Sequence, residues 1–595
     1  MTKSGKAEQQ GADSKKRRQQ ELQQRVLGHL SLIYPDADTE KLTEQLLKKM
    51  GLDAACEKPR WHKNNWDEKD VAVITYANSL LRENERPLVT LNRFLDKHLK
   101  EVVSWVHILP FFPFSSDDGF AVIDYTQVNE SYGDWGHIGR ISKKFSLMSD
   151  LVINHCSAMG RWFEQLKMNK RPGKDYFLAV DKRYDVSNVV RPRTTPILRE
   201  VQTLDGIKHI WCTFSHDQPD LNFRNPAVLL EMVKIIRLYL ERGVKIFRLD
   251  AVAFLWKEEG SSCLNLNQTH EIVRLIRTLV EYHSPGAIII TETNIPNVEN
   301  ISYFGNANEA HLVYNFSLPP LLLNTLVTGN CHALKSWMMS MPPAQKGTTF
   351  FNFIASHDGI GLRPLEGLIE EEELGHLMGL MENNGGRVSW RTLESGEAKP
   401  YEINISLFDA LKGTMDNPDD GMQEDRFICV HAIMLAVEGV PAFYIHSLLG
   451  TENDYEKFSH TTNNRALNRH NWDIDELESR LRDDTHHSRI FNELKCLIKI
   501  RKQQKAFHPN AIMFTLHIGD EVFAFWRQSL KRDQSIFCLN NITAQPREVL
   551  LSSLNLVITE SWQDLVSKQE LEVGQTSLIL KPYQTVWLTN KFHNE

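Results

Sequence analysis

The sequence has no cysteine pattern that would hold a metal or form a compact disulfide network. Its 8 cysteines are scattered over 595 residues and include no Cys-x-x-Cys pair, the spacing that zinc and redox motifs require. Isolated thiols are typical of proteins that stay reduced in the cytoplasm. We therefore expect free cysteines and a cytoplasmic location.

Long hydrophobic runs are also missing. The longest candidate for a membrane span, residues 427–445, is interrupted by His431, Glu438, Gly439 and Pro441, and so predicts a helix, a loop and a buried strand. The first 20 residues are polar, with a basic cluster at residues 15–18 and no apolar stretch behind it. They are not a secretory signal, and we expect a disordered tail over residues 1–20 and no membrane partner.

An excess of positive charge is absent too. The chain has 68 basic and 76 acidic residues, a net charge of -8, which provides no broad positive field and excludes nucleic acid as a partner. Apolar residues are abundant, at 42% of the chain with 28 Phe, 13 Trp and 14 Tyr. The composition predicts a globular protein with a large core.

The pattern of apolar residues divides the chain into segments. Residues 21–65 form an N-terminal helical segment, because apolar side chains recur there at helical spacing. Residues 66–510 alternate short apolar runs with long amphipathic segments such as 226–242, which looks like a crossover helix ending at Gly243. The candidate strands are residues 71–76, 105–109, 147–153, 245–249, 287–291, 311–316, 348–353 and 440–445.

Eight such units predict an α/β fold, a (β/α)8 TIM barrel. The gaps between its third and fourth and between its seventh and eighth strands are too long for simple loops, so we expect insertions at about 156–225 and 365–425. Beyond residue 510 the apolar pattern has a period of two. Residues 511–595 are therefore predicted to form an antiparallel C-terminal β domain.

Polar residues follow several of the predicted strands, where a barrel of this kind has its active site. They are Asn154 and His155, then Arg248 and Asp250, then Glu292, and then His357 and Asp358. Convergent carboxylates suit glycosyl transfer, which needs a nucleophile and a proton donor. The alternative is a divalent-metal hydrolase. The His-x-His or Glu-x-x-His spacings that would favour it are absent here, so we predict no metal and no cofactor.

Four stretches, residues 150–155, 243–252, 292–294 and 356–359, resemble in order the signature stretches of the α-amylase family, glycoside hydrolase family 13. Residues 107–129, 248–263, 316–323 and 355–361 are similar to its sucrose phosphorylase branch. Within that branch, residues 291–294, 401–411 and 464–469 look most like glucosylglycerate phosphorylases. Glucosylglycerol phosphorylases are not separated from them by these residues.

The resemblance implies roles for individual residues. Asp250 matches the nucleophile, Glu292 the general acid and base, and Asp358 the third carboxylate. Arg248 lies beside the nucleophile, where a fixed cation favours an ionised Asp250. The remaining residues that match positions holding the glucose ring are Asp117, Phe120, His155, His357 and Arg465.

The phosphate and acceptor positions lie in the two insertions. Arg193 and Tyr401 match loop positions that contact phosphate in this branch, and Glu402 stands where sucrose phosphorylases carry Gln. Lys399 has two interpretations, a cation for an anionic acceptor such as glycerate or a solvated loop lysine. Asn154 matches a residue that holds calcium in many family members, but the branch generally lacks the metal.

The sequence therefore predicts a retaining α-glucoside phosphorylase. Its expected partners are a small glucoside, with glucosylglycerate favoured, and inorganic phosphate, and its expected product is α-D-glucose 1-phosphate. Glucosylglycerol, sucrose and sucrose 6-phosphate remain alternative substrates. Two further alternatives are an α-glucosidase or transglucosidase of the same fold and an inactive scaffold homologue, against which the intact carboxylates argue.

Overall fold

The structure is a computed structural model that describes residues 3–590 except 55, 62, 194, 393–397, 462, 555, 557–560 and 573. Residues 1–2 of the predicted tail and 591–595 of the predicted C-terminal domain lie outside the described residues.

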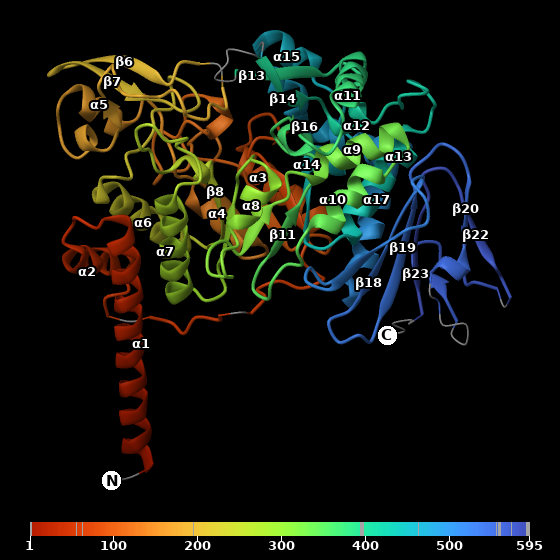
Figure 1. The fold of residues 1–595 in the computed structure, drawn as a ribbon, viewed down its shortest axis with the longest axis horizontal. Coiled ribbons are helices and arrows are strands. Elements are labelled where there is room, and N and C mark those ends of the chain that lie inside the picture. Colours follow the sequence, from red (N-terminus) through yellow and green to blue (C-terminus); the bar gives the residue numbers. More distant parts are fainter. Residues whose placement is uncertain are drawn as a thin grey trace.

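A closed barrel of parallel strands forms the centre of the molecule (Figure 1). Its strands, in chain order, are β1 (Ala72–Thr75), β3 (Trp105–Ile108), β4 (Ser146–Val152), β8 (Val244–Asp250), β9 (Ile288–Thr291), β10 (Leu312–Tyr314), β11 (Thr349–Asn352) and β15 (Val440–Tyr444). Each overlaps one of the apolar runs, so the predicted barrel is confirmed. These runs are apolar on both faces because the barrel interior lies on one side and helices on the other.

Helices connect consecutive barrel strands. In α6 (Pro226–Glu241) the Asn225 side chain caps the first turn by accepting from the Ala227 N–H, and Pro226 has the φ that a first helical residue needs. Gly243, at φ 93°, ends the connection in the left-handed region, where an L side chain would be strained. Local sequence signals thus set the length of this crossover.

The other helices from α3 onward cover the barrel or belong to its insertions. They are α3 (Pro87–Phe94), α4 (Trp135–Ser142), α5 (Arg161–Lys167), α7 (Asn267–His283), α8 (Asn297–Ser302), α9 (Leu318–Thr328), α10 (His332–Ser340), α11 (Glu371–Asn383), α12 (Leu407–Ala410), α13 (Gln423–Ala436), α14 (Ile445–Leu448), α15 (Tyr455–Thr461), α16 (Ile474–Arg480) and α17 (His486–Lys502).

Two small antiparallel sheets stand in the long connections. The connection between β4 and β8 carries β5 (Ala179–Val180), β6 (Leu198–Thr203) and β7 (Gly206–Trp211), and the one between β11 and β15 carries β12 (Ile360–Gly361), β13 (Arg387–Thr392) and β14 (Ala398–Asn404). Figure 1 shows both at the upper side of the barrel. The β2 (Leu80–Leu81) and β16 (Trp472–Asp473) strands pair separately.

The C-terminal part is an antiparallel β domain, as predicted. Its main sheet contains β17 (Ile512–Leu516), β18 (Val522–Gln528), β19 (Ser535–Asn541), β23 (Thr585–Thr589) and β21 (Gln563–Asp564). A second pair consists of β20 (Arg547–Leu550) and β22 (Ser577–Leu580). The domain lies beside α13 and α17, away from the insertions (Figure 1).

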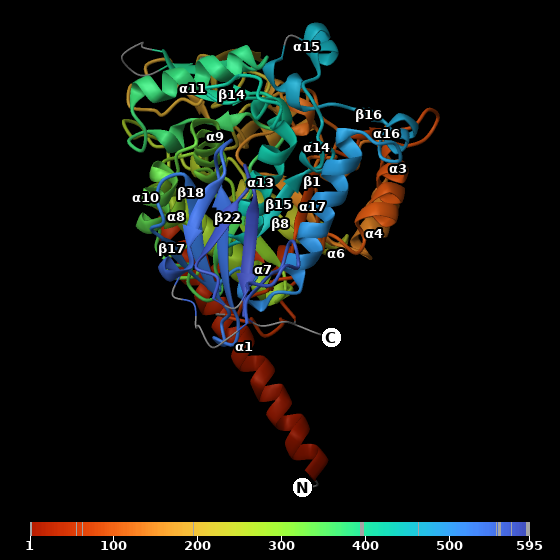
Figure 2. The same ribbon diagram turned by 90° about the vertical axis from the view of Figure 1, so that its right-hand side faces the viewer.

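The N-terminal segment differs from the prediction in one respect. Helix α1 (Lys3–Ile33) begins inside residues 1–20, which the sequence analysis assigned to a disordered tail. The early residues are rich in Lys, Gln and Arg, which are good helix formers, and they extend the buried half of the helix outward (Figure 2). The second half of α1 packs on α7, and α2 (Thr39–Met50) packs on α6.

No helix in the described ranges has both the length and the hydrophobicity that crossing a bilayer requires. Residues 427–445, the longest apolar candidate, divide into part of α13, a turn at Gly439 and strand β15. The sequence prediction for this segment is confirmed.

Candidate active site

A cavity opens at the carboxyl ends of the barrel strands. Its walls come from the strand ends and from both insertions. Every site residue predicted from the sequence lines it: Asp117, Phe120, His155, Arg193, Arg248, Asp250, Glu292, His357, Asp358, Tyr401, Glu402 and Arg465. The structure therefore brings together residues that are up to 348 positions apart (117 to 465), and their roles stay predictions.

Arg248 is the central cation at the base of the cavity. Its Nη1 lies 2.5 Å from Asp150 Oδ1 and 2.8 Å from Asp250 Oδ1, and its Nη2 lies 3.8 Å from Glu292 Oε2. Arg248 and Asp250 share a face of β8 because they are two residues apart. On the far side, His107 on β3 holds Asp150 through its Nε2 at 2.7 Å.

The Asp250 and Glu292 carboxyls interact through their surroundings. Burial raises the pKa of Asp250 well above its usual range, with the negative Glu292 and Asp150 adding to the shift and Arg248 opposing it. Burial also raises the pKa of Glu292, again opposed by Arg248. Two buried carboxyls near one cation titrate as a pair, and at intermediate pH they share a proton.

Ala251, directly after Asp250, has a strained backbone. Its φ of 50° lies in the left-handed region, which costs a residue with a Cβ roughly 1–2 kcal/mol. In this conformation its N–H donates to Glu292 Oε2 at 2.9 Å. The strain thus links the backbone at one carboxylate to the position of the other.

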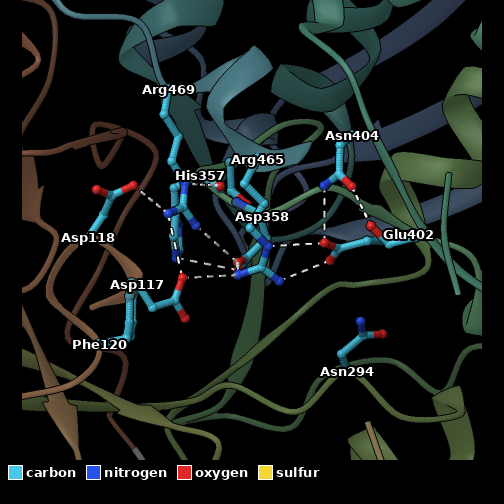
Figure 3. A network of polar contacts seen from close by, with 12 residues as sticks. Asp117, Asp118, Phe120, Asn294, His357, Asp358, Glu402, Asn404, Arg465 and Arg469 are labelled. Atoms are coloured by element: carbon cyan, nitrogen blue, oxygen red, sulfur yellow. Dashed lines mark hydrogen bonds and ion pairs between the residues drawn. The ribbon is translucent and has the colours of Figure 1, made fainter. Parts of the chain in front are cut away.

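Asp358 belongs to a second charged network, drawn in Figure 3. Arg465 Nη1 lies 2.6 Å from Asp358 Oδ1, while the other side of the same guanidinium contacts both oxygens of Glu402, each at 3.0 Å. Burial would raise the pKa of Asp358, but Arg465, Arg248 and neighbouring arginines lower it overall. Asp358 is therefore a carboxylate at neutral pH.

Asp117 and Asp118 form one wall of this network. Both have positive φ, 51° and 48°, and Arg469 Nη1 contacts them at 3.6 Å and 2.7 Å. The next residue must be glycine, because a Cβ at Gly119 would lie 2.5 Å from the Pro110 carbonyl oxygen. Ion pairing with Arg469 holds the turn in its strained conformation.

An aromatic surface completes this side of the cavity. The Phe120 ring stacks on His357 with centroids 5.0 Å apart and planes 4° from parallel. His155 Nε2 contacts the Phe120 carbonyl at 3.1 Å. Burial lowers the pKa of both histidines, so each is neutral and offers polar edges beside an apolar ring. Sugars have this same mixture of polar edges and apolar faces.

The insertions contribute the outer wall. The Arg193 guanidinium lies 5.6 Å from the centroid of the Tyr401 ring. Glu402, on β14, faces the cavity with its carboxylate already bound by Arg465 and by Asn404 Nδ2 at 3.0 Å. Lys399, for which the sequence left two interpretations, is on β14 but is not among the residues that line the cavity.

The Asn154 side chain does not face an open cation site. Its Oδ1 accepts from Lys257 Nζ at 2.8 Å, and the same ammonium lies 2.6 Å from Asp220 Oδ2. Lys257 therefore supplies the positive charge at this position. A separate group, Glu452, His486 and His487, has metal-like spacing among the described residues. However, Arg480 lies 3.3 Å from His487 Nε2, and the group is outside the cavity.

Comparison with known proteins adds to this geometry. A model of the α-amylase catalytic domain matches residues 97–360. The glucosylglycerate phosphorylase of Escherichia coli K12 is 39% identical over 95% of this chain and 100% of its own length. The chain belongs to the α-amylase family. A glucosylglycerate phosphorylase of Allomeiothermus silvanus is also 39% identical, over 96% of this chain and 99% of its own.

A solved structure is similar to most of the chain. The crystal structure of sucrose 6F-phosphate phosphorylase from Thermoanaerobacter thermosaccharolyticum has a TM-score of 0.69 at 25% identity, over 80% of this chain and 94% of that one. The resemblance to the family and to its sucrose phosphorylase branch, predicted from the sequence, is confirmed.

Some residues of the site were not singled out from the sequence. Asp150 stands inside a quoted motif, and a carboxylate within an apolar strand was itself a signal of a buried ion pair. Asn294, Asp118 and Arg469 also stand inside stretches that resemble the family, but the sequence assigned them no role because their partners are distant in the chain. Gln218 and Arg363 lie outside those stretches, although both line the cavity.

Proposed function

We propose that this protein is a retaining phosphorylase that cleaves glucosylglycerate with inorganic phosphate and forms α-D-glucose 1-phosphate and glycerate. The observation that carries this proposal is the position of Arg193 over Tyr401, in the cavity that holds Asp250 and Glu292. A guanidinium and a phenol that line the same cavity suit an incoming phosphate, which accepts from both. Family members similar over the full chain with this activity support it.

In the first step, an Asp250 oxygen attacks the anomeric carbon and Glu292 gives its proton to the departing glycosidic oxygen. This requires an ionised Asp250 and a protonated Glu292. Arg248 contacts Asp250 at 2.8 Å and Glu292 only at 3.8 Å. Burial raises the pKa of both carboxyls, but they titrate as one pair, and we assign the negative charge to Asp250, which is nearer the shared cation, and the proton of the pair to Glu292.

In the second step, a phosphate oxygen attacks the anomeric carbon from the opposite face. Glu292 takes the proton from the phosphate hydroxyl, and the bond to Asp250 breaks to release its carboxylate. Two inversions retain the α configuration. Arg193 and Tyr401 would orient the phosphate and neutralise part of its charge.

The glucose ring would lie between the two charged networks. Asp358 and Asp117 are carboxylates that accept from sugar hydroxyls, and His155 and His357 are neutral partners. The Phe120 ring covers an apolar face of the sugar. Because Arg465 fixes Asp358 at 2.6 Å, the contact to the hydroxyls is preorganised for the transition state.

Phosphate dependence tests the reaction class. With glucosylglycerate and phosphate, we expect α-glucose 1-phosphate to form and the rate to rise with phosphate until saturation. Release of glucose at the same rate with and without phosphate would instead identify an α-glucosidase or transglucosidase. If no α-glucoside is turned over, the result would instead support an inactive scaffold homologue.

An acceptor panel tests the substrate. With α-glucose 1-phosphate as donor, we expect glycerate to be used in preference to glycerol, fructose and fructose 6-phosphate. We also place the reaction in the cytoplasm, because all 8 cysteines are free thiols, which is typical of a reducing compartment.

A further inference from the structure

Arg363 is a cavity residue with no role in the mechanism described so far. It begins the short 3₁₀ turn Arg363–Leu365, which follows β12 in the second insertion. Its side chain lines the same cavity as Glu292, Asn294 and Tyr401. It therefore shares the cavity with the predicted proton donor Glu292 and with residues of the outer wall.

The charge of Arg363 is not compensated by the described residues. Its Nη1 donates to the Asn294 carbonyl at 3.3 Å, and its Nε is buried without a hydrogen-bond partner. No carboxylate of the described residues lies within 4.0 Å of it. Two carboxylates, Glu366 and Glu299, act on the charge of Arg363 from a distance. Both bind other partners, since Glu366 pairs with Arg391 at 2.8 Å and Glu299 accepts from Asn265 at 2.6 Å.

The four arginines that line the cavity fall into two groups, those with an ion pair and those without one among the described residues. Arg248 and Arg465 are ion-paired with carboxylates at 2.8 Å or less. Within the described part of the chain, Arg193 and Arg363 have no such pair. The Nε of Arg363 is buried, and a desolvated guanidinium without an anion is costly, so a bound anion would stabilise this side chain. Arg193 is half-buried.

The two arginines without an ion pair among the described residues, Arg193 and Arg363, correspond in number to the two anions of the proposed reaction. The proposed reaction brings phosphate into the cavity in one step and releases a carboxylate-bearing three-carbon acid in the other. Asn294 adds a neutral acceptor beside Arg363, because its buried Oδ1 has no hydrogen-bond partner and suits a hydroxyl of the leaving acid, while its Nδ2 lies 3.5 Å from the Tyr401 hydroxyl. Guanidinium and carboxylate have matching geometry for paired hydrogen bonds.

We infer that Arg363 binds the carboxylate of the leaving acid and so selects an anionic three-carbon acceptor, while Arg193 serves phosphate. This inference rests on the proposed function. It assigns the choice between glycerate and glycerol, which differ only in the carboxylate, to one side chain.

The test compares Arg363→Gln and Arg363→Lys with the unaltered enzyme on two substrates, glucosylglycerate and glucosylglycerol. We expect Arg363→Gln to lower kcat/KM for glucosylglycerate by about 10- to 100-fold, the usual effect of losing one charged hydrogen bond. The value for glucosylglycerol should change by less than about 3-fold. Arg363→Lys should keep part of the preference for glucosylglycerate, because it keeps the positive charge but loses the planar pair of donors that can bind both carboxylate oxygens.

Arg387→Gln is the matched control. It removes an equal charge from the neighbouring strand β13, where Arg387 donates to the Gly386 carbonyl and does not line the cavity. We expect it to leave the ratio of the two kcat/KM values unchanged. The melting temperature of each variant shows whether the fold is intact. If Arg363→Gln is unstable, the ratio of the two kcat/KM values is measured on Arg363→Lys alone.

Two outcomes overturn the inference. An equal loss on both substrates together with a raised KM for phosphate would assign Arg363 to phosphate, and an unchanged ratio would give it no role in selection. Either can occur while the unaltered enzyme forms α-glucose 1-phosphate from glucosylglycerate. If the unaltered enzyme fails to do so, the proposed function fails instead.

Discussion

The base and the outer wall of the cavity are built in different ways. We call the residues Asp150, Arg248, Asp250 and Glu292 the floor, and Arg193, Arg363 and Tyr401 the rim. Floor residues come from barrel strands or from positions directly after them, and Arg248 is in contact with all three floor carboxylates. Rim residues come from the insertions, and the two rim arginines lack ion pairs among the described residues.

The difference indicates a division of labour. Neighbouring parallel strands hold side chains in fixed register, which suits groups that must meet a reacting carbon accurately. Loops can change in length and sequence without disturbing the barrel, which suits groups that choose the partners of the reaction. The floor should therefore control the chemical step, and the rim should control which anion is bound.

The largest effect should come from the floor nucleophile. Asp250→Ala is expected to lower kcat by on the order of 10⁴-fold or more, because the covalent route is lost. Glu292→Gln is the comparison variant, with α-glucosyl fluoride as substrate. Fluoride leaves without a proton, so Glu292→Gln should form the glucosyl enzyme from it and Asp250→Ala should not. Near-normal turnover by Asp250→Ala would disprove the mechanism.

Asp150 tests whether the floor acts as a unit. Asp150→Asn leaves Arg248 with one carboxylate fewer and should cost about 3–5 kcal/mol of unfolding free energy, the usual effect of breaking a buried ion pair. Because Arg248 then moves relative to Asp250, kcat should also fall by roughly 10²-fold. The measurements are the melting temperature and kcat.

The control for this change is Asp175→Asn. Asp175 pairs with Arg171 at 3.0 Å on the surface, and such pairs contribute roughly 0–1 kcal/mol. A fall in stability for Asp150→Asn no larger than that of the control would mean that the floor residues are independent.

Rim changes should alter partner choice more than chemistry. Arg193→Gln is expected to raise KM for phosphate about 10-fold, as expected for a lost charge-assisted contact, and to raise the share of glucose among the products. Arg183→Gln is the control, since Arg183 belongs to the same insertion but is exposed and pairs with Asp181 at 3.2 Å. An equal loss of kcat for both half-reactions would place Arg193 with the floor.

The smallest effect should follow metal removal. A chelator is expected to change activity by less than about 2-fold, because Lys257 already donates to Asn154 and neutralises Asp220, whereas a metal would have to displace it. Lys257→Met should lower the melting temperature, since it leaves Asp220 buried without its cation. Loss of activity in the chelator alone would contradict this account.

The sequence predicted the floor more fully than the rim. Arg248, Asp250 and Glu292 stand in motifs at strand ends, and local order along the chain places such residues at one end of the barrel. For the rim, Arg193 and Tyr401 were found through resemblance, whereas Arg363 was not found. The role inferred for Arg363 depends on which nearby carboxylates already bind other residues, and no local sequence pattern shows this.

Periodicity of apolar residues determined the barrel and the C-terminal sheet, because burial on both faces or on one face leaves a direct imprint on the order of residues. Pairing between distant side chains was decided by tertiary structure alone. Arg469 meets Asp118 across 351 positions, and Arg465, expected only to close the glucose site, also occupies Glu402. Such partners are set by where the folded chain places each charge, since electrostatic contacts depend on distance in space and not along the sequence.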